Sequence, residues 1–469
     1  MDLRILNVGT LLLFILFTGA IICYDVKVSE NEPTRINIVS PSAGFTGGGV
    51  TIWYLAACLI KAGFQVRYFM QNSATGRPAN STILRYESLS DELHNIGSIL
   101  EFDSGERPVP CNPHDLWMAT WCKSWDAVFA AQSQLKNFRP LYLIQDDERW
   151  LNKEQATRSY SFDHYTIFNG PPLKDWVSFH KLGVFSKGIK HGEGHSYTAT
   201  AALAARVPVT AALLAARRKP YNGKKRLAVY YRSHAERNKP SMILEVLSQL
   251  LFRRVVSIQK WNIVGVSDHG PIAICTLANG TACLQIPAML APKEYDDFLG
   301  SCDVAISLCT SGGASWPVID FATHGAVVVT NAVSRAHKQF FESMASTVLT
   351  TSNVTVAALL ALVEKAFVIS NSLTLEQRAA AANEASTHFP TSFCADECFG
   401  KTFTEKLRAW MNGIVLVDDG KAKSILKSFR SINKAAFIQL SVYFTLTRII
   451  MFVFLTFVKQ QCKSFRRCR

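Results

Sequence analysis

The sequence predicts an α/β protein of two doubly wound, Rossmann-like domains that face each other across a cleft. Short apolar segments typical of buried strands alternate with helical segments in two consecutive blocks, which is the pattern of parallel sheets covered by helices. A polar, turn-rich stretch at residues 217–225 separates the blocks and predicts a linker. In each block a glycine-rich turn follows a strand. With 469 residues, the chain is long enough for two such domains.

The first block, residues 34–216, opens with a strand, a glycine loop, a helix and a second strand. These four elements are expected at residues 35–40, 47–49, 50–61 and 65–70. They predict a βαβ unit, because hydrophobic periodicity changes from strand to helix and back. The alternation continues at residues 127–131, 141–145 and 165–168.

The second block, residues 226–385, repeats the alternation and contains the most informative stretch of the chain. After a strand that begins at Arg226, further elements are expected at 242–253, 262–266, 284–286 and 292–300. Residues 302–331 then have the pattern of a buried strand, a Gly/Ser-rich turn, a short helix with one acid, a glycine stop and a second buried strand. Nucleotides bind at the carboxyl ends of strands in such sheets, so this stretch predicts a nucleotide-diphosphate site. Helices within 386–415 are expected to pack back on the body.

The charge is concentrated in the C-terminal tail. The formal net charge is +14, and residues 420–469 hold eleven Lys or Arg and no Asp or Glu, which leaves about +3 for the rest. A nearly neutral body argues against nucleic-acid binding. No nucleic-acid partner is therefore expected.

Both ends of the chain carry hydrophobic segments that predict membrane targeting. Residues 1–23 form a signal peptide or an uncleaved signal anchor, and the sequence leaves both open. Residues 435–458 are long enough for a transmembrane helix, which needs about 20 apolar residues. Arg448 lies near the middle of this segment, so a basic amphipathic helix on the membrane surface remains the alternative. A basic linker, 416–434, precedes the segment and a basic tail, 459–469, follows it.

Three acceptor sequons favour a glycosylated body in the lumen of the secretory pathway: Asn80, Asn279 and Asn353. Each triplet alone is a weak signal, but the N-terminal targeting segment strengthens it. We therefore expect a membrane-anchored body that faces the lumen of the endoplasmic reticulum or Golgi. Cys462 and Cys468 would then be cytosolic, as palmitoylated or as unmodified thiols.

The cysteines predict local disulfides in an oxidising compartment. The pairs Cys111–Cys122 and Cys394–Cys398 are close enough in sequence to form them. Two further cysteines flank a buried strand and are expected to be core thiols: Cys302 and Cys309.

Two arginines and the start of a short helix predict the donor site. Arg232 ends a buried strand and Arg237 follows five residues later, where a pair of guanidinium groups suits a diphosphate. The helix that starts at Ser315, with Pro317 close behind, offers backbone N–H groups to an anion. Asp320, one turn further in, is placed to accept ribose hydroxyls. The alternative is an ordinary pair of surface arginines.

The acceptor side is expected in the first block, at Gly47, Gly48, Gly49, Gln145, Asp146 and Glu148. The glycines precede a helix and allow a ligand or the facing domain to approach the backbone. The acids follow an apolar strand and therefore lie at a carboxyl edge. The alternatives are a tight glycine turn and a solvated strand-to-helix turn capped by Asp147.

Other chemistries lack their usual markers. The glycine cluster has no Gly-Lys-Ser/Thr, and no GxGxxG is present, so neither ATP nor nicotinamide chemistry is indicated. No CxxC pair is present, so we expect no metal and no cofactor. Three tryptophans recur every four residues and predict an amphipathic packing face rather than a sugar platform: Trp117, Trp121 and Trp125.

In these motifs the chain resembles glycosyltransferases of the GT-B fold, in the broad family-4-like group, and among them the bacterial S-layer rhamnosyltransferase type. The resemblance runs from about residue 35 to 411. Besides the glycine loop and its helix, the motifs that carry it lie at 115–121, 142–148, 230–238 and 315–331. The last of these, Ser-Trp-Pro-Val-Ile-Asp with a glycine five residues on, is the most specific.

The resemblance implies a metal-independent transfer of a sugar, such as the deoxyhexose rhamnose, from a nucleotide diphosphate to a hydroxyl acceptor. It implies catalytic roles for Arg232, Arg237 and Asp320. The residues implied in donor binding are Tyr231, Gly313, Ser315, Thr330 and Asn331. The family-4 pattern has two glutamates eight positions apart, and here Gly312 and Asp320 stand at those positions. That departure keeps two rivals open, a non-catalytic binding protein of the same fold and a sugar-nucleotide epimerase.

Overall fold

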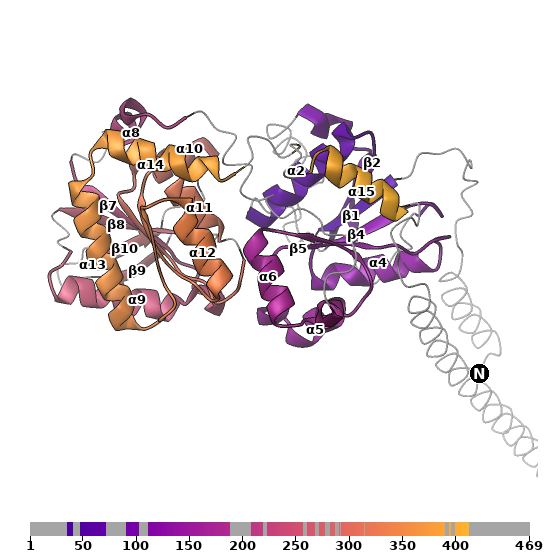
Figure 1. The fold of residues 1–469 in the computed structure, drawn as a ribbon, viewed down its shortest axis with the longest axis horizontal. Coiled ribbons are helices and arrows are strands. Elements are labelled where there is room, and N and C mark those ends of the chain that lie inside the picture. The colour runs from indigo at the N-terminus through magenta and orange to yellow at the C-terminus, as the bar shows by residue number, and fades with distance from the viewer. Residues whose placement is uncertain are drawn as a thin grey trace, which may run out of the picture. The chain divides into compact units, whose positions relative to one another are not determined.

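The computed structural model describes residues 35–411 with internal gaps at 41–46, 72–90, 103–110, 188–207, 219–222, 257–259, 268–271, 277–281, 287–289, 291, 314, 390–393 and 395–398. The described residues form two sheets with helices packed on them (Figure 1). The doubly wound α/β class expected from the sequence is therefore confirmed.

The first sheet has six parallel strands in the order β3-β2-β1-β4-β5-β6. The strands are β1 (Arg35–Ser40), β2 (Gln65–Gln71), β3 (Ser98–Phe102), β4 (Leu116–Ala119), β5 (Leu141–Ile144) and β6 (Tyr165–Phe168). The helices are α2 (Gly47–Lys61), α4 (Trp125–Gln132), α5 (Lys153–Ser159) and α6 (Pro171–Phe179). The direction of winding reverses between β1 and β4, as in dinucleotide-binding sheets.

The second sheet has seven strands in the order β13-β12-β11-β7-β8-β10-β9. They are β7 (Lys225–Tyr230), β8 (Trp261–Val266), β9 (Ile272–Thr276), β10 (Ala282–Ile286), β11 (Val304–Ser307), β12 (Val327–Asn331) and β13 (Val348–Thr351). Only β9, at the edge, runs antiparallel. The helices are α9 (Pro240–Phe252), α10 (Pro292–Ser301), α11 (Trp316–Ala322), α12 (Arg335–Met344) and α13 (Val356–Ser372). The winding reverses between β7 and β11.

Burial on both faces explains why the central strands are continuous apolar runs. Every residue of β5, β11 and β12 is buried. Helices cover both faces of a parallel sheet, so alternation of polar and apolar residues is lost and Val, Ile and Leu dominate. This is the pattern from which the strands were expected.

Two local expectations in the first block are wrong. Residues 127–131 belong to α4, and the strand beside β1 is instead β4. The three evenly spaced tryptophans do not share a helix face, because Trp117 lies in β4, Trp121 in the turn after it and Trp125 at the start of α4.

After α14 (Leu375–Thr387), the chain places its last described helix, α15 (Lys401–Met411), on residues of the first block. Trp410 accepts a hydrogen bond at its carbonyl oxygen from Arg139 Nη1 (3.1 Å), and its Nε1 donates to the Arg139 carbonyl (3.4 Å). The Trp410 ring also lies 6.0 Å from that of Tyr165 in β6, and Figure 1 shows α15 among the elements of the first sheet, although it lies at the other end of the sequence.

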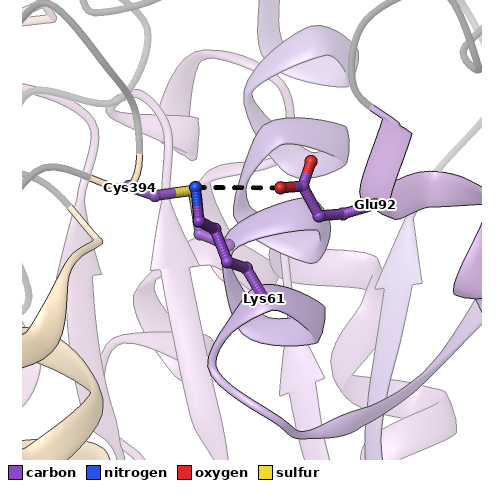
Figure 2. The surroundings of a disulfide bond; sticks show 4 residues. Lys61, Glu92 and Cys394 are labelled. Atoms are coloured by element: carbon purple, nitrogen blue, oxygen red, sulfur yellow. Dashed lines mark ion pairs between the residues drawn. A yellow bond between two sulfur atoms is a disulfide. The ribbon is translucent and has the colours of Figure 1, made fainter.

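A disulfide joins Cys58 of α2 to Cys394, which is 336 residues away (Figure 2). The Lys61–Glu92 ion pair, with Nζ and Oε1 3.8 Å apart, lies beside it. Both local pairings expected from the sequence are therefore wrong: Cys111 and Cys122 are free thiols and Cys394 is bonded elsewhere. Sequence proximity failed because helix α2 presents its cysteine to a segment that returns from the other end of the chain.

The expected core thiols are confirmed, since Cys302 and Cys309 are both free and buried.

Replacing Cys58 with serine is expected to lower the free energy of unfolding by about 2–4 kcal/mol, because the bond restricts the unfolded chain over a long loop. Urea denaturation of the purified, non-reduced protein measures the loss. Cys111→Ser is the matched control, because it makes the same chemical change at a free cysteine. Equal losses in the two variants would show that the bond constrains nothing.

The terminal segments predicted to meet the membrane, 1–23 and 435–458, lie outside the described residues, as do Asn80 and Asn279. No helix in the part of the chain that the structure describes is long and apolar enough to cross a membrane. Asn353 is described and is exposed in the turn between β13 and α13.

Candidate functional site

The second sheet offers a site where its winding reverses. The loops after β7 and β11 leave the carboxyl ends of neighbouring strands, where doubly wound sheets bind ligands. These loops are tied together, because Asn238 Nδ2 donates to the Leu308 carbonyl (3.1 Å) and Thr310 N donates to the Arg237 carbonyl (2.8 Å). The backbone around Arg237 is therefore fixed relative to β11.

Arg237 contacts residues of the first block. Its Nη1 forms an ion pair with Asp146, which follows β5, and the two side chains are only 20% and 15% exposed. Its guanidinium carbon lies 4.5 Å from the centre of the Trp150 ring. A guanidinium held by a carboxylate and stacked on an indole is well oriented and keeps its charge.

Arg232 lies on the same loop but has a different neighbour. Its Nη2 is 3.2 Å from His234 Nε2, and the side chain is half-buried. The structure thus puts both predicted arginines at the carboxyl end of β7, with Arg237 in direct contact with Asp146.

The turn after β11 needs its glycines for close approach to the first block. A Cβ atom on Gly312 would lie 2.3 Å from Cβ of Trp176, and one on Gly313 would lie 3.2 Å from Asp146 Oδ1. Trp176 is held in place because its Nε1 donates to Asp147 Oδ2 at 2.9 Å. A glutamate at position 312, as in the family-4 pattern, has no room here.

Several residues expected to bind the donor are instead part of the domain interior. Tyr231 is 8% exposed and belongs to the hydrophobic core under α9, where burial raises the pKa of its hydroxyl. Asn331 holds the backbone of Cys309 with two hydrogen bonds of 2.8 Å, and Thr330 beside it is buried. Asn331 therefore ties the end of β12 to the start of the loop after β11.

Asp320 is also turned inward. Its carboxylate is 4% exposed and accepts a hydrogen bond of 2.8 Å from the Tyr295 hydroxyl of α10. Ser315, at the start of α11, has a φ of +49° and its side chain makes no capping hydrogen bond. One oxygen of the Asp320 carboxylate is therefore already hydrogen-bonded inside the domain.

Of the residues predicted on the acceptor side, the glycines and Gln145 lie together at the strand ends, whereas Glu148 is buried inside the first block. Gly47, Gly48 and Gly49 form the first turn of α2, so they are helical rather than part of a preceding loop. Gly48 lies against Gln145, since a Cβ there would be 2.6 Å from Gln145 Oε1. Gln145 Nε2 donates to the Thr120 carbonyl at 3.3 Å, which places these groups at the carboxyl ends of β4 and β5.

Glu148 lies inside the first block. It is 3% exposed, accepts a hydrogen bond of 3.0 Å from the Tyr142 hydroxyl, and accepts another from the backbone N–H of Cys122. Burial raises its pKa to about 8, although these hydrogen bonds favour the charged form. This glutamate joins the ends of β4 and β5 and does not face solvent.

Replacing Glu148 with glutamine is expected to remove a pH-dependent loss of stability. The ordinary pKa is 4.5, so between 4.5 and about 8 the folded protein keeps a proton that the unfolded chain releases. The free energy of unfolding therefore falls as pH rises through that window. Melting temperatures of both proteins from pH 4 to 9 should diverge toward high pH, with the glutamine variant higher, while exposed Glu154→Gln follows the wild type. Parallel curves would contradict the assignment.

Trp150, Trp176 and Tyr295 were missed by sequence reasoning. No spacing links Trp176 to Gly312, or Tyr295 to Asp320, because each contact forms only when the chain folds. For Trp150, the one signal in the sequence was its position two residues after the Asp-Asp-Glu run.

Metal-binding side chains do not gather in the described ranges, where no group of three or more His, Cys, Asp or Glu could hold an ion.

Comparison with known proteins supports the same architecture. Residues 225–363 match the family model of the WsaF C-terminal domain. HepE of Anabaena, solved with UDP and glucose, has a TM-score of 0.55 at 12% identity, over 80% of this chain and 100% of that one. The same protein with UDP-glucose has a TM-score of 0.54 at 12% identity, over 80% and 99%. No curated protein matches in sequence.

The resemblance that the sequence motifs predicted is confirmed by the WsaF match and by this fold. The chain therefore has a GT-B-like fold of two doubly wound domains, and over residues 225–363 it is similar to the C-terminal domain of WsaF.

Proposed function

We propose that this protein is a glycosyltransferase that moves a sugar from a nucleotide-diphosphate donor to a hydroxyl acceptor. The observation that carries the proposal is the position of Arg237. It lies on the loop where the second sheet reverses its winding, and it faces Asp146 on a strand-end loop of the first sheet. HepE, which shares the fold, was solved with UDP-glucose and with UDP and glucose.

The chemistry follows from the charge that develops during transfer. When the bond between the sugar and the phosphate breaks, the leaving diphosphate gains negative charge. A fixed guanidinium stabilises that charge without reorganisation, and Arg237 with Arg232 would do so here. The glycine turn at Gly312 and Gly313 lets Trp176 and Asp146 of the first block approach its backbone closely. The acceptor would approach from Gln145 and Asp146.

The kind of sugar, the transfer without a metal and the cellular compartment are also part of the proposal. The resemblance to rhamnosyltransferases favours a deoxyhexose donor and transfer without a metal. The Cys58–Cys394 disulfide is typical of an oxidising compartment, which supports a luminal body in the endoplasmic reticulum or Golgi. Exposure of Asn353 is compatible with its glycosylation there.

The test begins with the full chain purified in detergent. Thermal shifts with UDP, GDP and dTDP identify the base, and the matching nucleotide sugars are then incubated with a mixture of hydroxyl acceptors. We expect one nucleotide to raise the melting temperature and its sugar to appear on an acceptor by mass spectrometry. A donor converted to an isomer without any acceptor would point to an epimerase and overturn the proposal.

A binding protein without turnover is the second candidate, and two observations favour it. Trp176 fills the space that a glutamate at position 312 would need, and Asp320 is buried with one carboxylate oxygen hydrogen-bonded to Tyr295. Calorimetry that shows tight binding of a nucleotide sugar, together with no product from any acceptor, would select this candidate.

A further inference from the structure

The Asp146 carboxylate faces the two groups that we propose bind the donor diphosphate, which are the Arg237 guanidinium and the glycine turn at Gly312 and Gly313. It forms the ion pair with Arg237 Nη1. Its Oδ1 also lies against the glycine turn, at 3.2 Å from where a Cβ of Gly313 would be. An anion thus already sits between the guanidinium and the turn, where the proposed function puts a phosphate.

Asp146 is held in that position by its own block. Its Oδ1 accepts a hydrogen bond from Asp147 N at 2.8 Å, and its carbonyl oxygen accepts one from the Tyr160 hydroxyl at 3.1 Å. The side chain is 15% exposed, so solvent screens it only in part. A second anion brought to Arg237 would meet this carboxylate at close range, where like charges repel strongly.

We propose that Asp146 is an internal competitor of the donor: it occupies Arg237 until the diphosphate displaces it. The nature of the displacing ligand rests on the proposed function. Donor binding then separates the loop after β5 from the loop after β7, and it releases the Asp146 carboxylate toward the acceptor. The donor affinity of the wild-type protein is lowered by the free energy of the Arg237–Asp146 pair.

Inorganic pyrophosphate is the probe, because it carries the diphosphate without any assumption about base or sugar. Titration calorimetry compares the wild type with Asp146→Asn. We expect the dissociation constant to fall about tenfold, the equivalent of one charge-assisted hydrogen bond that no longer has to be broken. Arg237→Gln should weaken binding, and Asp146→Asn should bring no gain in the Arg237→Gln background.

Glu236→Gln is the matched control, because it removes the same charge at an exposed residue next to Arg237. An equal gain in this control would overturn the proposal, since overall charge would then explain it. Affinity that is unchanged or weaker in Asp146→Asn, or undetectable in both proteins, would also overturn it. Tighter pyrophosphate binding by Asp146→Asn without sugar transfer by the wild type would reject the proposed function alone.

Discussion

Replacing Arg237 with alanine is expected to lower kcat/KM for sugar transfer by about a thousandfold, the upper range for removing one preorganised donor to a developing anion. The loss should be this large because the guanidinium is stacked on Trp150 and its backbone is tied to the loop after β11 before the substrate arrives. Initial rates with the donor identified by thermal shift measure the effect. The melting temperature should change little, because the pair joins two loops and not the core.

Arg237→Lys separates charge from geometry. Lysine keeps the positive charge but has no planar fork, so we expect an intermediate loss. Arg253→Ala, at an exposed position at the end of α9, should leave the rate unchanged. Arg232→Ala should also abolish transfer if both arginines bind the diphosphate. Near-normal turnover in Arg237→Ala would remove the central residue from the proposed site.

Replacing Asp115 with asparagine is expected to cost about 3–5 kcal/mol of stability, because it leaves the buried Arg67 guanidinium and the partly exposed Arg35 guanidinium without their counter-charge. The Asp115 carboxylate is fully buried and accepts hydrogen bonds from Arg35 Nε (2.9 Å) and Arg67 Nη2 (2.9 Å). The Asn112 backbone N–H donates to the same group at 2.9 Å. Urea denaturation measures the loss.

Asp126→Asn is the control for this effect. Asp126 is an exposed acid in the first turn of α4, where a charge contributes at most about 1 kcal/mol through the helix dipole. A similar, small loss in both variants would mean that Arg35 and Arg67 find solvent or other partners when Asp115 is neutral.

The architecture could be predicted because its signal is local. Continuous apolar strands followed by glycine turns are visible in sequence, and they fix where the carboxyl ends of the strands lie. The strand β4 was missed because it carries Trp117, whose spacing to later tryptophans imitates a helix face. The equally short β5 and β6 have no such competing pattern and were expected.

The sequence predicted which loops form the candidate site, but it did not predict which side chains face that site. Neighbouring residues at a strand end point in opposite directions, so Tyr231 enters the core while Arg232 remains half-buried at the edge. Which partner meets each side chain depends on tertiary contacts. The approach of Trp176 to Gly312 and the pairing of Asp146 with Arg237 join residues whose sequence positions give no hint of contact.

The bond between Cys58 and Cys394 turns most of the described chain into a covalent ring. A single cut by a protease anywhere between these residues leaves one molecule, whose two pieces separate only after reduction. Of the described strands, all except β1 lie within the ring. A nicked protein can therefore keep the loops after β5 and β7 on the same molecule, and it would escape notice on a non-reducing gel.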